Sequence, residues 1–255
     1  MTDSMRIQAG ALTKRYGQHA AVSSLDLSVE AGSILGLVGP NGAGKTTTLR
    51  CLAGIIPPTS GRIIIDGFDL SAQPLEAKRR LSFVPDTPHL FDYLTVEEHL
   101  RFAGRIYGIP DVAERSDALL SEFELDDRRN HLPGTLSRGM KQKVAICLGF
   151  LHRPTAIFLD EPLTGLDPLG IRRMKSAISR RAREDGASII VSSHQLELIE
   201  EICDGILVIK KGVEVISGSL ESIRSQLDGL PEDPTLEDIF FAVTGDEGDA
   251  RTATP

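Results

Sequence analysis

The sequence of 255 residues is 41% hydrophobic and 25% charged, which is ordinary for a globular protein with one large domain or two small ones. Its net charge of -8 disfavours a free-standing nucleic-acid binder, because contacts with phosphates favour a basic balance. The longest apolar run, residues 144–151, is far too short for a membrane-spanning helix, so we expect a cytoplasmic protein that meets a membrane only through a partner.

The first part of the chain, residues 6–38, predicts β-strands. Leu25, Leu27 and Val29 alternate with polar residues, which is the period of a half-buried strand. Tyr16 precedes the motif described next, and an aromatic ring at that place could stack on a nucleotide base. Its position fits a tyrosine in a surface turn equally well, so both interpretations remain open.

Residues 39–47 carry the pattern of a phosphate-binding loop. Gly39 is followed, after four residues, by Gly44, Lys45 and Thr46, between an apolar strand at 34–38 and a helix expected from Thr47. Glycines let the backbone approach an anion closely, and N–H groups of the loop and helix start point at it. Lys45 can reach the terminal phosphates, and the Thr46 hydroxyl can bind Mg2+. The predicted phosphate-binding residues are Gly39, Pro40, Asn41, Gly42, Ala43, Gly44, Lys45, Thr46 and Thr47.

The middle of the chain changes from strands to helices. Asp66-Gly67 between apolar segments predicts a β-hairpin. A capping-box pattern at Thr95 opens a helix, and two more helices are predicted at 112–123 and 141–151. We interpret residues 87–153 as a mainly helical insertion.

Strands and helices alternate after the insertion. One strand, residues 82–85, is predicted before the insertion. After it, the predicted strands are residues 155–160, 187–191 and 205–209, and the predicted helices are residues 168–184 and 195–202. Strands separated by helices favour a largely parallel sheet. The predicted fold class is therefore α/β, with a mainly parallel sheet, an antiparallel β portion and the helical insertion. We place the main domain at 1–225, a C-terminal extension at 226–244 and a disordered tail at 245–255, because that tail is acidic, small and polar.

An apolar strand ends in two carboxylates, Asp160 and Glu161. Ligands of open α/β sheets bind at the carboxyl ends of strands, and neighbouring strand residues point in opposite directions. Asp160 is predicted to hold the Mg2+ shell, and Glu161 to polarise the attacking water as a general base. His194 follows the next strand and can contact the γ-phosphate or the water. Such acids often only cap a helix, and a lone histidine is usually structural, but the phosphate loop favours the catalytic interpretation.

The helix predicted at 168–184 is rich in basic residues. They are Arg172, Arg173, Lys175, Arg180, Arg181 and Arg183. The pattern fits a nucleic-acid-binding stripe or a solvated helix face, and the acidic total of the chain favours the solvated face.

Taken in order, these motifs resemble the ATP-binding subunit of ABC transporters. The resemblance covers residues from about 6 to 244, and it rests on Tyr16, the loop 39–46, Leu136-Ser-Arg-Gly-Met140, Leu159-Asp-Glu-Pro162, Gly165-Leu-Asp167 and His194. It implies ATP and Mg2+ as cofactors. It also implies a second nucleotide-binding subunit, identical or paralogous, and a transmembrane permease as partners at the cytoplasmic face of the membrane.

The resemblance further implies a head-to-tail dimer around two ATP molecules. Each ATP would lie between the phosphate loop of one subunit and the signature segment of the other, which is Ser137, Arg138, Gly139 and Met140. The start of the helix after Ser137 would be a second anion site. Gly165, Leu166 and Asp167 match the segment that runs along the dimer seam. Tyr16 matches the aromatic residue that stacks on adenine.

Three positions depart from the family pattern. Arg138 and Met140 stand where glycine and glutamine are usual, and Arg138 either brings a positive charge near the γ-phosphate or points to solvent. A basic residue before Gly-Met resembles exporters whose membrane subunits are separate chains, as does the ending 235–245. Asp86 stands where the family usually has a glutamine that touches Mg2+ and links the site to the membrane subunit. An aspartate there can bind Mg2+ directly or through water.

We therefore expect an ATPase subunit that powers transport, in the direction of export, and that makes no direct contact with nucleic acid. The main alternative is a non-transport relative that acts as an ATP-driven clamp on nucleic acid or the ribosome. Such relatives usually carry two of these domains or a long coiled-coil insertion, and neither is recognisable here. A switch that binds ATP without hydrolysis is disfavoured by Asp160, Glu161 and His194.

Overall fold

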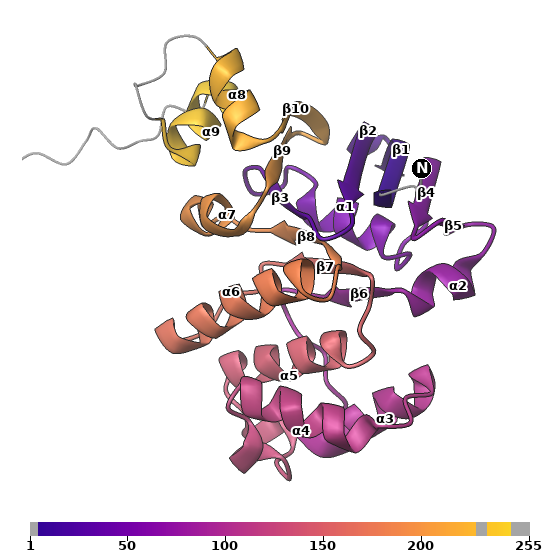
Figure 1. The fold of residues 1–255 in the computed structure, drawn as a ribbon. Helices are drawn as coiled ribbons and strands as arrows, with labels where there is room; N and C mark the ends of the chain where they lie inside the picture. The colour runs from indigo at the N-terminus through magenta and orange to yellow at the C-terminus, as the bar shows by residue number, and fades with distance from the viewer. Residues whose placement is uncertain (1–4, 228–233, 246–255) are drawn as a thin grey trace, which may run out of the picture.

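A computed structural model describes residues 5–227 and 234–245, and every structural statement below concerns these residues. Two sheets form the body of the protein, with helices packed around them (Figure 1). Of the tail predicted at 245–255, only Gly245 falls within the described residues.

The main sheet has six strands in the order β10-β9-β3-β8-β7-β6. They are β3 (Ile34–Val38), β6 (Leu81–Val84), β7 (Ala156–Asp160), β8 (Ser188–Ser192), β9 (Gly205–Lys210) and β10 (Val213–Gly218). All neighbours pair in parallel except β10, which is antiparallel to β9. Every residue of β7 and β8 is buried, as expected where helices cover both faces of a parallel sheet. The predicted parallel sheet is confirmed.

The second sheet is antiparallel and contains the first two strands of the chain. Its order is β2-β1-β4-β5, with β1 (Met5–Tyr16), β2 (His19–Glu30), β4 (Ser60–Ile65) and β5 (Phe68–Asp69). The predicted hairpin at Asp66-Gly67 is confirmed, since Ile65 pairs with Phe68 and both turn residues have positive φ, 48° and 82°. Helix α1 (Lys45–Leu52) buries Leu49 and Leu52 in the core shared with this sheet.

The segment between β6 and β7 is helical and forms the lower part of the molecule in Figure 1. Its helices are α3 (Val96–Tyr107), α4 (Val112–Glu122) and α5 (Arg138–Phe150). The predicted capping box is present, because Thr95 and Glu98 bond to each other's backbone N–H groups. Val144 and Phe150 of α5 pack into the same core as the parallel strands, which fixes the segment to the sheet.

The remaining helices cover the sheet and the end of the chain. They are α2 (Pro74–Arg79), α6 (Pro168–Arg183), α7 (Leu196–Ile202), α8 (Leu220–Gln226) and α9 (Leu236–Thr244). The sequence did not predict α2 or α8, which are one or two turns long and carry little periodicity. Among the described residues, no helix combines the length and apolar character needed to cross a bilayer.

Two helices begin earlier than predicted. Helix α1 starts at Lys45 rather than Thr47, directly after Gly44 in the left-handed conformation. Helix α5 starts at Arg138 rather than Lys141, because the Ser137 hydroxyl caps it by accepting from the Met140 N–H at 3.2 Å. Both corrections place a helix start directly at the predicted ligand-binding residues.

Candidate functional site

A cavity of about 460 Å³ lies where β3 and β7 end. It is lined by residues 41–47 and by Tyr16, His19, Ala21, Asp86, Asp160 and Glu161. The structure thus brings together most of the residues predicted to bind ATP and Mg2+. Gly39 and Pro40 lie just before this lining, and they contact Lys45 through their carbonyl oxygens.

Lys45 is held within the phosphate loop. Its Nζ donates to the carbonyl oxygens of Gly39 at 2.5 Å and Pro40 at 3.2 Å, and the residue is only 8% exposed. Burial lowers the pKa of the Lys45 ammonium, while the carboxylates of Glu161 and Asp160 act in the opposite direction. Neutral carbonyls compensate a positive charge less well than an anion does. A phosphate group would therefore compensate this ammonium better than the carbonyls of the loop do.

Gly44 shows why the loop needs glycine. Its φ of 109° is in a region that side chains rarely adopt, and a Cβ atom would lie 2.4 Å from the Ala21 carbonyl oxygen. The loop can pass this close to β2 only without a side chain. Residues 44–47, at the start of α1, line the cavity, and the free N–H groups of a helix start are what an anion site requires.

The Thr46 hydroxyl and the Asp160 carboxylate lie side by side. Thr46 Oγ1 donates to Asp160 Oδ1 at 3.2 Å, and Ser192 Oγ donates to the same oxygen at 2.7 Å. No cluster of three His, Cys, Asp or Glu side chains within the described ranges could hold a metal alone. A hydroxyl and one carboxylate fit Mg2+, which usually keeps several waters and takes further oxygens from a phosphate substrate.

Glu161 lines the cavity and is hydrogen-bonded to His194, which lies outside the lining. Glu161 Oε2 lies 2.7 Å from His194 Nδ1 and also accepts from the His194 backbone N–H at 3.3 Å. Glu161 has φ 49°, a strained conformation for a side-chain-bearing residue, and its N–H donates to the Ser192 carbonyl at 3.1 Å. The carboxylate is thereby fixed in direction, as a base acting on one water must be.

Sequence reasoning missed Ser192. This residue bonds Asp160 through its hydroxyl, and the same hydroxyl accepts from the Glu161 N–H at 3.2 Å. The available signal was that Ser192 directly follows the strand predicted at 187–191. In the structure β7 and β8 are adjacent, and Asp160 pairs with Ser192.

Tyr16 ends β1 at the same cavity. Its side chain is half exposed, at 52%, and Lys14 Nζ lies 5.2 Å from the ring centroid. An exposed aromatic face at the edge of a phosphate site is available for stacking on a base. Its place beside the turn at residues 17–18 also agrees with a surface-turn tyrosine, so the stacking role stays a prediction.

The signature and seam segments touch each other within one chain. A Cβ atom on Gly139 would lie 2.3 Å from the Gly165 carbonyl oxygen, so the two backbones are in direct contact. Leu166 packs against the main core, and Asp167 caps α6 by accepting from the Gly170 N–H at 3.0 Å. Ser137, Gly139 and Met140 are not among the residues that line the phosphate cavity of their own chain.

Arg138 makes an interaction that the sequence did not indicate. Its Nη2 donates to Asp86 Oδ1 at 3.2 Å, so two of the departures from the family pattern form an ion pair. Asp86 also lines the phosphate cavity, which places this pair at the edge of the nucleotide site.

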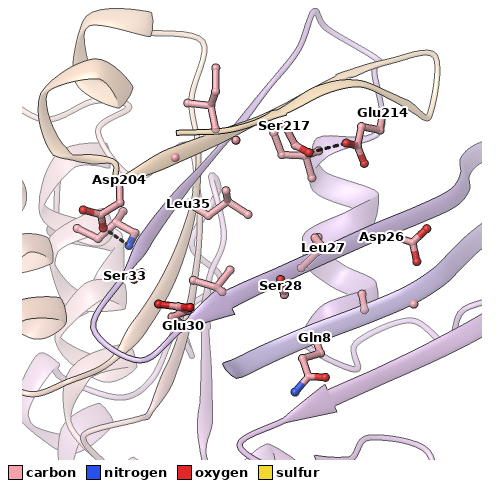
Figure 2. Close-up of a pocket in the computed structure, with 18 of the residues that line it drawn as sticks. Gln8, Asp26, Leu27, Ser28, Glu30, Ser33, Leu35, Asp204, Glu214 and Ser217 are labelled. Atoms are coloured by element: carbon pink, nitrogen blue, oxygen red, sulfur yellow. Dashed lines mark hydrogen bonds between the residues drawn. The ribbon is translucent and has the colours of Figure 1, made fainter. Parts of the chain in front are cut away.

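A larger cavity, of about 790 Å³, lies at the other end of β3, between the two sheets (Figure 2). Four carboxylates surround it, from Asp26, Glu30, Asp204 and Glu214, against the single cation of Arg62. Because like charges repel, this cavity is unsuited to a triphosphate. Size alone would have selected the wrong site, and the phosphate-loop residues identify the smaller cavity as the nucleotide site.

Known proteins share both the sequence and the fold. The model of the family described as "ABC transporter" matches residues 22–164, more than half of the chain. The SkfA peptide export ATP-binding protein SkfE of Bacillus subtilis (strain 168) is 37% identical over 208 residues, which are 81% of this chain and 86% of SkfE. A solved structure described as the ATP-binding subunit of an ABC transporter has a TM-score of 0.87 and 34% identity, and covers 93% of this chain and 99% of that one. The dimeric structure of the bacterial ABC transporter cassette MJ0796 has a TM-score of 0.78 over 84% of this chain and 98% of that one, at 24% identity.

Proposed function

Because the chain belongs to the ATP-binding subunits of the ABC transporter family, we propose that its ATPase activity drives export through a separate membrane permease. The observation that carries this proposal is the cavity where the phosphate loop, Asp160 and Glu161 meet, with His194 bonded to Glu161. The peptide-export role of SkfE supports the direction of transport. The subunit would bind peripherally, at the cytoplasmic face of the membrane.

Each residue at the site has its own role in ATP hydrolysis. The N–H groups of residues 41–47 and the Lys45 ammonium bind the phosphates and offset their charge. Glu161 orients the attacking water and accepts its proton. His194 holds the Glu161 carboxylate by a hydrogen bond and would contact the γ-phosphate or the water. Tyr16 stacks on the adenine. The reaction produces ADP and phosphate.

Mg2+ is the metal that this donor set would hold. The Thr46 hydroxyl and the Asp160 carboxylate supply two oxygens, 3.2 Å apart, and Ser192 fixes the carboxylate from behind. Asp86 lies on the same cavity and is a third candidate, directly or through water. When bound, the metal neutralises charge on the phosphate oxygens.

Two copies of the domain would complete each site. The signature segment does not line its own phosphate cavity, yet Ser137 stands at the start of a 13-residue helix, whose N–H groups attract anions. A head-to-tail pair would place that helix start against the ATP of the other copy. The dimeric cassette of the same fold supports this arrangement.

The permease would dock on an apolar groove beside Asp86. This groove, of about 570 Å³, lies between the loop after β6 and helices α3 and α5, and Pro85 and Pro88 line one side of it. Phe91 is 59% exposed and Ile106 is 65% exposed, which is unusual for large apolar side chains gathered in one place. An element of the membrane subunit that inserts apolar side chains into this groove would bury Phe91 and Ile106.

Copurification from membranes tests the proposal. A tagged wild-type chain should bring down a transmembrane protein and hydrolyse ATP, and the variant Phe91→Glu/Ile106→Glu should lose that partner while it still binds ATP. Leu75→Glu is the control, because Leu75 is equally exposed, at 62%, but lies on α2. If ribosomes or DNA copurify in place of a membrane protein, the clamp alternative replaces transport.

A further inference from the structure

A third cavity, of about 780 Å³, is strongly basic. It lies between α4, the end of α5 and α6, and shares no lining residue with the phosphate cavity. Leu119, Phe150 and Leu169 supply an apolar part of its wall. Its charged lining residues are Arg115, Arg153, Arg172, Arg173, Arg180, Arg181 and Glu122. Six guanidinium groups against one carboxylate is a marked excess in a chain whose net charge is -8.

Hydrogen bonds hold four of these guanidinium groups in place. Arg180 and Arg181 both bond the Glu122 carboxylate, and Arg181 also lies 5.1 Å above the Phe150 ring. Arg173 donates to the Glu122 carbonyl at 3.1 Å and to Glu124 at 2.6 Å. The fourth, Arg115, is held by Asp111. The positive charges are therefore oriented before any ligand arrives, which reduces the entropy lost on binding.

Arg115 and Arg153 close the side of the cavity near α5. Arg115 donates to Asp111 at 2.9 Å and to the Leu151 carbonyl at 3.3 Å. Arg153 follows two residues later, in the turn after α5. Within the described ranges, Arg153 and Arg172 make no ion pair, and both are exposed. Two exposed cations without an ion pair thus stand beside four that hydrogen bonds hold.

The arginine side chains of this cavity are suited to bind phosphate groups. Arginine presents a planar fork of donors that matches phosphate oxygens in pairs, and charge-assisted bonds of this kind are the strong ones. The volume is within the usual range for a small-molecule site. We propose that this cavity binds a small soluble polyanion with two or more phosphate groups, as a second site distinct from the ATPase site.

A solvated helix face does not account for this arrangement. The charges come from α4, from the turn after α5 and from α6, and they converge on one hollow. Two other basic residues of α6 turn away from it, since Lys175 pairs with Glu201 and Arg183 pairs with Asp204. The basic residues of the helix are thus divided between the cavity and ordinary surface pairs.

Inorganic tripolyphosphate, titrated by calorimetry in EDTA, tests the proposal. The Lys45→Ala chain is the reference, because loss of this ammonium weakens the anion site of the phosphate loop. We expect this chain to bind tripolyphosphate with an affinity that falls with salt. Adding Arg153→Glu/Arg172→Glu should weaken that binding at least tenfold, and Arg153→Gln/Arg172→Gln should weaken it less.

The control is Lys78→Glu/Arg105→Glu in the same background, which makes the same change in charge at two exposed cations outside the cavity. It should leave the affinity within twofold. With Lys45 intact, Arg153→Glu/Arg172→Glu should keep normal ATP hydrolysis, which shows that the variant folds. The proposal is wrong if the Lys45→Ala chain binds no tripolyphosphate, or if both charge reversals weaken binding equally. Binding only to phosphatidylglycerol vesicles would also overturn it.

Discussion

The guanidinium of Arg138 lies 3.2 Å from the carboxylate of Asp86, and this pair joins the first turn of α5 to the loop after β6. One turn further along α5, the buried Gln142 donates to the Pro85 carbonyl at 3.3 Å. Two contacts therefore connect α5 with the loop that reaches the phosphate cavity. A movement of that loop on ATP binding would be transmitted to the helix start proposed to serve the partner subunit.

Removal of Arg138 is expected to weaken ATP binding by the same chain. Without the guanidinium, the Asp86 carboxylate faces the triphosphate uncompensated, and like charges repel. Both side chains are about half exposed, so we expect an effect of no more than about 1 kcal/mol, or about fivefold in affinity. Titration of Arg138→Ala with ATP in EDTA measures it, and Asp86→Asn should restore the affinity. A loss that Asp86→Asn does not reverse would show that Arg138 acts in another way.

Glu161→Gln is expected to separate binding from hydrolysis. The amide cannot accept the proton of the attacking water, while the phosphate loop and Lys45 are untouched. ATP affinity should stay near that of the wild type, and turnover should fall by about 10²-fold or more, the usual contribution of a positioned base. Phosphate release under saturating ATP measures the turnover. Unchanged release would remove Glu161 from the role of base.

Lys45→Ala is expected to lose affinity for ATP. Its ammonium lies among the loop's own carbonyls and is the cation closest to the predicted phosphate position. Equilibrium binding of a fluorescent ATP analogue should be at least tenfold weaker, since charge-assisted bonds to phosphate are strong. Lys78→Ala, on exposed α2, serves as the control and should bind normally. Wild-type affinity in Lys45→Ala would contradict the site.

The stability of the protein should depend on His152 at mildly acidic pH. Its Nε2 donates to the Leu81 carbonyl at 3.0 Å, the ring stacks on Tyr107 at 3.8 Å, and Nδ1 is buried without a described partner. Burial lowers the pKa of His152 below its ordinary value of 6.5, and the hydrogen bond to Leu81 partly opposes this.

The sign of the effect follows from linkage. As the pH falls through 6.5, the unfolded chain takes up a proton at His152 before the folded chain does, so the free energy of unfolding decreases. Above pH 6.5 both states are neutral and the contribution is constant. Urea unfolding at pH 7.5 and 5.5 should therefore show a larger loss for the wild type than for His152→Gln. Equal losses in the two proteins would contradict this assignment.

The sequence predicted those parts of the site that depend on local spacing. The glycines and Lys45 of the phosphate loop follow from a strand-loop-helix pattern, and Asp160 and Glu161 follow from the end of an apolar strand. The contact between Ser192 and Asp160 could not be predicted in the same way, because it requires β7 and β8 to be neighbours. The pair of Arg138 and Asp86 joins side chains 52 positions apart, and no periodicity records such a contact.

Two signature residues, Ser137 and Gly139, shape the start of α5. Ser137 caps α5 in the described structure, and Gly139 is pressed against Gly165 of the same chain. Both features hold the start of α5 in one conformation, in which its N–H groups could bind a phosphate of the ATP on another subunit. Their role in the partner's site stays a prediction until two copies are seen together.

The molecular mass of the Glu161→Gln variant in Mg2+ and ATP, measured by light scattering, tests the central claim most directly. The account predicts a monomer without nucleotide and a dimer with ATP, and it predicts that Ser137→Arg in the same variant prevents the dimer while its own phosphate loop still binds ATP. A Glu161→Gln protein that stays a monomer when saturated with ATP, or a dimer that forms equally well with Ser137→Arg, would contradict the claim that each ATP is held between two subunits.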